Sequence, residues 1–175
     1  ASLAEAAAAM DQPGWGDAAV GAAEFLLEHL RRDGRWHRSW SAQAAEASHR
    51  AVANDLAALI DALVRLGELT GERRWEAEAR DVADELLNNH LDESTGTLWT
   101  TPDDGETLVG RPRDVVDGAI PSANSVAAGA MLRLAALTGA THYADAGRAI
   151  IAAVAPLAEG RGMSFAHLLA AAEDD

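Results

Sequence analysis

The hexapeptide Leu66-Gly67-Glu68-Leu69-Thr70-Gly71 is followed four residues later by Trp75, and Leu134-Ala135-Ala136-Leu137-Thr138-Gly139 is followed by Tyr143 at the same distance. The glycines and the aromatic residues of the two copies are both 68 positions apart (139−71 and 143−75). A weaker copy begins at Pro13-Gly14-Trp15. A recurring period indicates one supersecondary unit used several times, each copy burying its face on the next.

Each unit is predicted to be a helical hairpin. Between 52 and 70 the apolar side chains recur at i, i+3, i+4 and i+7 from Leu56 onward, which is the spacing of one helix face. Gly71 then ends the helix, because glycine adopts the left-handed conformation without a Cβ clash. The pattern predicts helices before Met10 and near 17–31, at 52–70 and 74–91, at 123–138 and 142–158, and finally near 163–173.

The connections alternate in length: turns within hairpins are short, whereas residues 32–51 and 92–121 form long loops between hairpins. Connections of one kind lie at one end of an antiparallel array, so both long loops are expected on one face, beside the positive ends of helices. Strand-like pieces are expected at 35–40 and 97–100. The turn Asp103-Asp104-Gly105 predicts a β-hairpin that returns at 107–109. Ligand-binding residues are expected on these loops.

Composition narrows the function classes. With 175 residues the chain is expected to form a single domain, and without cysteine it has no disulfide or thiolate zinc site. The formal net charge is −14, and all 14 basic residues are arginine. Nucleic acid and anionic membrane surfaces are therefore not expected as partners, whereas a neutral sugar meets no barrier. Neither a signal peptide nor a membrane span is visible, so a soluble, cytoplasmic protein is expected.

Residues 111–127 read Arg-Pro-Arg-Asp-Val-Val-Asp-Gly-Ala-Ile-Pro-Ser-Ala-Asn-Ser-Val-Ala. Together with Asp33-Gly34-Arg35 and Arg38-Ser39-Trp40, this run resembles the YyaL family, bacterial proteins akin to the spermatogenesis-associated thioredoxin-like protein of animals. That resemblance implies an α/α-barrel similar to N-acylglucosamine 2-epimerases and six-hairpin glycosidases, preceded in the family by a thioredoxin-like domain. Residues 1–175 would supply about half of the barrel and none of the thioredoxin part.

The expected fold is therefore all-α: a partial α/α toroid of about three helical hairpins plus a C-terminal helix, with a short β-hairpin in a long loop. A tetratricopeptide array is the alternative, since its repeat of about 34 residues doubles to 68. The long loops at alternate turns and the unlike helices within each hairpin count against it.

Four polar residues crowd the start of the helix at 123: Asp117, Ser122, Asn124 and Ser125. One reading is that they converge with the long loops on a polyol. The other is capping, in which the Ser122 hydroxyl accepts from a backbone N–H one turn on. Capping is favoured for Ser122, while both readings stay open for Asp117 and Asn124.

Asp55 lies in the first turn of the helix at 52–70, where it either faces the barrel mouth as an acid or base or complements the helix dipole. Glycoside cleavage needs two carboxylates about 5–10 Å apart, and Asp117 is the candidate partner. Trp40 is the preferred sugar platform, although tryptophans also anchor loops. Arg111 and Arg113 are expected either to pair with Asp114 or Asp117 and order the loop, or to hold an anionic sugar substituent.

The six histidines show no metal-binding spacing, so no metal and no cofactor are expected. His90 is expected at a helix end, where a cation suits the dipole. Two functions stay open: a sugar-binding barrel part related to epimerases, isomerases or glycosidases, and a non-enzymatic helical interaction module. Exposed apolar flanks predict either a homodimer or association with the missing barrel half.

Overall fold

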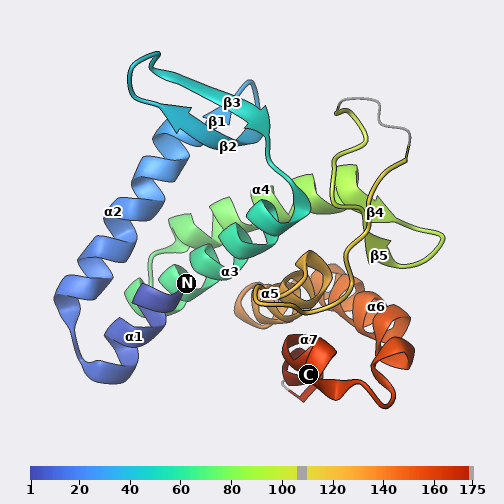
Figure 1. Ribbon diagram of the computed structural model, residues 1–175. Coiled ribbons are helices and arrows are strands. Elements are labelled where there is room, and N and C mark those ends of the chain that lie inside the picture. Colours follow the sequence, from blue (N-terminus) through green and yellow to red (C-terminus); the bar gives the residue numbers. More distant parts are fainter. Residues whose placement is uncertain (106–109, 174–175) are drawn as a thin grey trace.

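The computed structural model describes residues 1–105 and 110–173 (Figure 1). The described residues form antiparallel hairpins in the predicted places, and the predicted C-terminal helix follows them. The helices are α1 (Ser2–Met10), α2 (Pro13–Leu30), α3 (Ala53–Thr70), α4 (Arg73–His90), α5 (Ala123–Thr138), α6 (Thr141–Ala158), a short 3₁₀ helix η1 (Gly162–Phe165) and α7 (Ala166–Glu173).

The repeated hexapeptide has the same structure in both copies. Gly71 and Gly139 end α3 and α5 with φ of 69° and 71°, in the left-handed region that favours glycine. The preceding threonines each donate a hydroxyl to the carbonyl four residues back, at 2.7 Å for Thr70 and 2.6 Å for Thr138. The aromatic residues that follow are buried in the hydrophobic core. Local chemistry thus sets both hairpin turns, as predicted.

The helices form two rows. Helices α1, α3, α5 and α7 contact one another in that order and form an inner row, and each of the first three packs on the next helix of its own hairpin. The outer helix α4 forms an ion pair with α2, Arg74 Nη2 to Glu24 Oε1 at 2.9 Å, and one with the residue that follows α2, Arg31 Nη1 to Glu78 Oε2 at 3.0 Å. The hydrophobic core draws on all seven α-helices.

The first long loop, residues 31–52, holds a three-stranded antiparallel sheet of β1 (Arg31–Arg32), β2 (Arg35–Ser41) and β3 (Glu46–Arg50). The second long loop, residues 91–122, contains β4 (Leu91–Asp92) paired with β5 (Thr97–Leu98). A short β-hairpin in a long loop was predicted and is present as the β4–β5 pair, which precedes the predicted turn at 103–105. Its expected return strand at 107–109 lies outside the described residues.

Both long loops lie at one end of the helical rows, as predicted. The backbone N–H of Ala53, at the start of α3, donates to the Thr100 carbonyl of the second loop at 2.9 Å. Asn54 Nδ2 donates to the Pro121 carbonyl at 3.2 Å, just before α5. Arg35 of β2 also forms an ion pair with Asp104. The starts of α3 and α5 therefore form one rim with the two loops.

Candidate functional site

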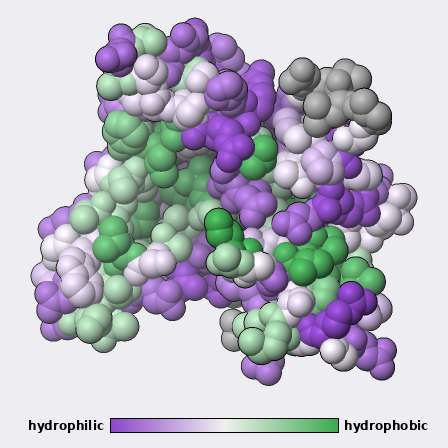
Figure 2. Space-filling view, in the orientation of Figure 1, coloured by the Kyte–Doolittle hydropathy of each residue, from purple (hydrophilic) through white to green (hydrophobic). Residues whose placement is uncertain are grey.

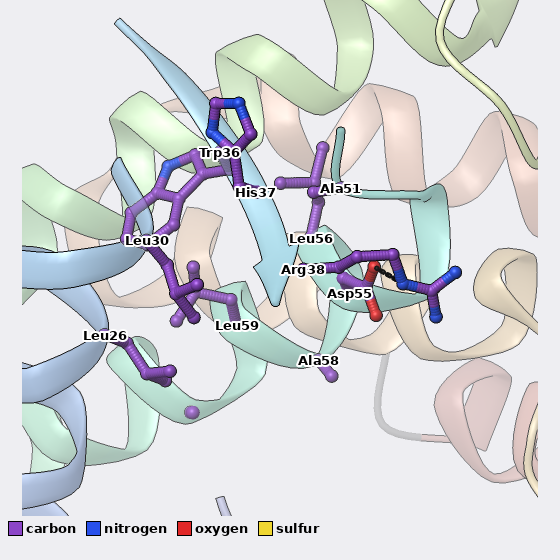
Figure 3. Close-up of a pocket in the computed structure, with 11 residues that line it drawn as sticks. Leu26, Leu30, Trp36, His37, Arg38, Ala51, Asp55, Leu56, Ala58 and Leu59 are labelled. Atoms are coloured by element: carbon purple, nitrogen blue, oxygen red, sulfur yellow. Dashed lines mark ion pairs between the residues drawn. The ribbon is translucent and has the colours of Figure 1, made fainter. Parts of the chain in front are cut away.

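A cavity of about 300 Å³ opens between α2, β2 and the first half of α3 (Figure 3). Most of its wall is aliphatic or aromatic, and its polar groups gather on the side of the first long loop. The polar lining residues are His37, Arg38 and Asp55; the others are Leu26, Leu30, Trp36, Ala51, Leu56, Ala58, Leu59 and Ala62. A mostly apolar wall with a few convergent polar groups is typical of small-ligand sites. We call this the rim cavity.

Asp55 and Arg38 form the polar pair of the rim cavity. Asp55 Oδ2 accepts a hydrogen bond from the Val52 N–H at 3.0 Å, which fixes the carboxylate at the first turn of α3. Arg38 Nε lies 3.5 Å from the same oxygen. The two side chains remain 34% and 50% exposed. The pair is therefore held in place by its own helix start and strand yet stays accessible to a ligand.

The two tryptophans of β2 have different roles: one lines the cavity and the other packs against α2. Trp36 is buried and lines the cavity. Trp40, the predicted sugar platform, stacks on His29 with ring centroids 4.6 Å apart and an interplanar angle of 25°. Its contact with α2 is the loop-anchoring alternative. Trp36, the less preferred platform candidate on this strand, lines the cavity with Arg38, since alternation along β2 places both on one strand face.

His37 adds an unsatisfied polar atom to the cavity wall. Its Nδ1 is buried and has no hydrogen-bond partner among the described residues. An unpaired buried polar atom is costly. The sequence offered no sign of this, because the burial comes from neighbouring elements.

The polar run before α5 has no such opening. Ser122, Asn124 and Ser125 are 0% exposed. Ser122 Oγ accepts from the Ser125 N–H at 3.1 Å, which is the predicted N-cap. Asn124 Oδ1 accepts from the Leu98 N–H, and its Nδ2 donates to the Asp114 carbonyl, both at 2.8 Å. The protein itself satisfies their polar groups, so the direct contact of these three residues with substrate stays a prediction.

Asp117 holds the same loop against the last helix. Its carboxylate accepts from the N–H groups of Ser122 at 3.0 Å and His167 at 2.9 Å. Burial acts to raise the pKa of Asp117, but these N–H groups and the Ser125 hydroxyl outweigh it and hold the pKa below its usual value. Asp117 is therefore a clamp between the start of α5 and α7. Among the described residues no contact joins it to Asp55.

Arg111 and Arg113 have other partners than predicted. Arg113 Nη1 donates to Thr95 Oγ1 at 2.8 Å, pairs with Asp92, and lies 3.9 Å from the centroid of the Trp99 ring. Arg111 Nη2 donates to the Asn89 carbonyl at 3.0 Å. The expected pairing with Asp114 or Asp117 is thus replaced by contacts within the second loop and with the end of α4. Both arginines hold this loop in place through these contacts.

His90 does not fit the expectation that it would be a cation at a helix end. It is 0% exposed, and its Nδ1 lies 3.0 Å from the Trp99 carbonyl. Burial lowers its pKa, and Arg111 and Arg35 lower it further, while the bond to Trp99 opposes them. The neutral imidazole is therefore favoured, and His90 supports the second loop as a buried donor instead of complementing the dipole of α4 as a cation.

Within 1–105 and 110–173, no group of three or more histidines or acidic residues is arranged to hold a metal ion. In the same ranges, no helix combines the length and apolarity that crossing a membrane would require.

Comparison with known proteins places the fold. No family model matches the chain, and no curated protein matches it. Among solved structures, a GH76 α-mannanase from Bacteroides thetaiotaomicron superimposes with a TM-score of 0.67 at 18% identity, over 86% of this chain and 40% of that one. The cellobiose 2-epimerase of Spirochaeta thermophila gives 0.66 at 19% identity, over 86% and 39%. A D-mannose isomerase gives 0.65 at 16% identity, over 85% and 36%.

These neighbours are α/α-barrel proteins of the six-hairpin glycosidase and N-acylglucosamine 2-epimerase type. The chain spans about 40% of the length of the mannanase and the epimerase. It therefore has the fold of a partial α/α toroid, as predicted.

Proposed function

We propose that this chain is a sugar-binding part of a carbohydrate-active α/α toroid, with its ligand at the rim cavity. The observation that carries the proposal is the Arg38–Asp55 pair, which stays partly exposed at the mouth of a mostly apolar cavity. Neighbours that share the fold are named as a mannanase, an epimerase and an isomerase of sugars, which supports this ligand class.

The lining groups match the two faces of a sugar ring. Asp55 supplies acceptor oxygens and Arg38 supplies donors, so both can bind hydroxyl groups. Trp36 and the leucines offer an apolar wall for the C–H face of the ring. A neutral or cationic sugar suits the formal net charge of −14, whereas an anionic sugar would depend on Arg38.

As for reaction class, we propose epimerase, isomerase or glycoside-hydrolase-like chemistry, with Asp55 as the acid or base. Asp117, the predicted second carboxylate, enters this proposal as a positioning residue, since its oxygens accept from backbone N–H groups. Trp40 supports β2 through its stacking on His29. In this proposal, any further catalytic group comes from the part of a complete barrel that residues 1–175 do not form.

Several finer features belong to the same proposal: a YyaL-type relationship, a bacterial source, a cytoplasmic location and one structural unit over residues 1–175. Of the two associations expected from the sequence, we propose completion by a missing barrel half. Two identical copies would each bring a formal charge of −14, which disfavours a homodimer. Light scattering at micromolar protein tests this, and a stable homodimer would contradict it.

Calorimetric titration with a panel of neutral mono- and disaccharides tests the ligand class. We expect at least one saccharide to bind, with a loss of affinity of tenfold or more in Asp55→Asn, the order of size expected when a charge-assisted hydrogen bond is removed. Asp145→Asn is the matched control, because Asp145 is an exposed carboxylate on α6, away from the cavity. No binding by any member of the panel, or equal affinity in Asp55→Asn, would overturn the proposal.

A further inference from the structure

An acidic face of α4 binds the start of the first loop. Glu78, Asp81 and Glu85 lie at i, i+3 and i+7, so they share one side of the helix. Arg31 of β1 donates to Glu78 Oε2 at 3.0 Å and to Asp81 Oδ2 at 3.1 Å. Arg35 of β2 donates to Glu85 Oε1 at 2.9 Å. These ion pairs attach the paired strands β1 and β2 to the outer row of helices.

The Glu85–Arg35 pair is the most enclosed of these contacts. Its side chains are 10% and 17% exposed, whereas Arg31 is 33% and Asp81 57% exposed. The same Glu85 oxygen also accepts a hydrogen bond from the backbone N–H of Trp36 at 3.3 Å. Partly buried charges are screened less than exposed ones, so these contacts are stronger than those at the exposed end of the face. Glu85 therefore fixes two consecutive residues of β2.

Trp36 connects this attachment to the rim cavity. Successive side chains of a strand point to opposite faces, so Arg35 faces α4 while Trp36 and Arg38 face the cavity. The Trp36 carbonyl accepts from the Ala51 N–H at 2.9 Å, so both polar groups of its backbone are bonded. Figure 2 shows the hollow with its hydrophobic floor beside α2, below the mostly hydrophilic residues of this sheet. The position of the aromatic wall thus depends on a contact made outside the cavity.

We infer that Glu85 is a positioning residue of the sugar site, which holds Trp36 in place as the aromatic wall of the rim cavity. The inference rests on the proposed function, since it concerns the same cavity. Glu85 is not one of the residues that line the cavity, so it acts through β2 and not by contact with the sugar. It lies on an outer helix, 49 positions along the chain from Trp36.

Arg35 has a second acidic partner, which allows Glu85 to be replaced. The Arg35 guanidinium also forms an ion pair with Asp104 of the second loop. Replacing Glu85 therefore does not leave a largely buried arginine without a partner, a change that would be strongly destabilising. Through this arginine the second loop also supports β2.

Glu85→Ala and Glu78→Ala form a matched pair of variants. Each removes one carboxylate from the same face of α4, and each leaves the bound arginine a second acidic partner. Only Glu85→Ala removes the acceptor of the Trp36 N–H. In ¹H–¹⁵N spectra of the sugar-free protein, we expect the Trp36 indole N–H to shift in Glu85→Ala and to exchange with solvent about tenfold faster than in the wild type. In Glu78→Ala it should stay as in the wild type.

Saccharide affinity is the second readout, measured by calorimetric titration well below the Tm of each variant. The probes are D-mannose, cellobiose and any other neutral saccharide that binds the wild type. We expect the Kd to rise about fivefold or more in Glu85→Ala and about twofold or less in Glu78→Ala. Glu85→Gln should recover part of the affinity, because its amide oxygen can still accept from the Trp36 N–H.

Two results would overturn the inference. One is a Trp36 indole N–H with the same shift and exchange rate in both alanine variants. The other is an equal Kd in Glu85→Ala and Glu78→Ala. If no saccharide binds the wild type, the proposed ligand is wrong, while the indole measurement still decides whether Glu85 holds Trp36 in place.

Discussion

The two long loops occupy equivalent positions in the repeat but differ in their relation to solvent. At the second loop, Asn124 in the first turn of α5 is buried, and its amide bonds Leu98 and Asp114 of the loop. At the first loop, Arg38 of β2 and Asp55 in the first turn of α3 stay partly exposed beside an apolar cavity. The many polar residues around the start of α5 therefore anchor a loop. The candidate site is instead at the Arg38–Asp55 pair, which is isolated but accessible.

The largest expected effect comes from the buried amide of the second loop. Asn124→Ala leaves the Leu98 N–H and the Asp114 carbonyl without their partners, so we expect it to lower the free energy of unfolding by about 3 kcal/mol. Urea unfolding measures this. The matched control is Asn88→Ala, an exposed asparagine on α4, with an expected change of about 0.5 kcal/mol or less. A change of the free energy of unfolding as small as that of the control would mean that Asn124 does not hold the second loop in place.

The Asp117 clamp is expected to contribute next. Asp117→Asn removes a charged acceptor of two backbone N–H groups and should lower the free energy of unfolding by about 2 kcal/mol at pH 7. The folded pKa lies below the unfolded value of 3.8, so this stability is fully present above pH 3.8 and is lost as the pH falls through the folded pKa.

Urea unfolding at pH 7 and at successively lower pH tests the clamp. The wild type and Asp117→Asn should converge as the carboxylate is protonated. A difference that stays constant down to the lowest pH would contradict the charged role of Asp117.

His90 gives the second loop a pH dependence at a higher pH. Its folded pKa lies below the unfolded value of 6.5, so the unfolded chain binds a proton first as the pH falls. Stability should therefore decline below pH 6.5, by about 1.4 kcal/mol per pH unit at most, until the folded pKa is reached. In His90→Asn the side-chain amide can still donate to the Trp99 carbonyl but does not titrate. A shallower decline of its unfolding free energy between pH 7 and 5 is expected, and an unchanged decline would contradict the assignment.

The smallest effect is expected in the first loop. Arg38→Ala breaks an ion pair between partly exposed side chains and should change the free energy of unfolding by about 0.5 kcal/mol or less. Arg113→Ala is the corresponding change in the second loop, where the arginine contacts Asp92, Thr95 and Trp99. We expect it to cost more than Arg38→Ala in the same urea titration. A larger loss of unfolding free energy in Arg38→Ala than in Arg113→Ala would contradict the difference proposed between the loops.

The hairpins could be predicted from the sequence because their determinants are local. Gly71 and Gly139 end helices whose apolar spacing is visible in the chain, and the aromatic residue after each glycine is buried as its position suggests. The role of the second loop could not be predicted in this way. Asn124 binds Leu98 from 26 positions away, and neither residue marks the other.

The candidate site was predictable only in part. Asp55 was expected at the rim because the start of a helix is visible in the sequence. The cavity beside it depends on how far apart α2 and α3 lie, which is set by tertiary packing. The pairing of β5 with β4 could not be predicted for a similar reason: the turn at 103–105 was the local signal, whereas this pairing involves the strand that follows α4.

The most direct test of the central claim is a saccharide titration followed residue by residue with ¹H–¹⁵N NMR spectra. The claim is that the first loop binds the ligand and the second loop supports the fold. Amide shifts are therefore expected at Arg38 and Asp55 and at the indole N–H of Trp36, while Asn124 and Ser125 stay unchanged. Shifts concentrated in residues 113–125, with the first loop unaffected, would contradict it.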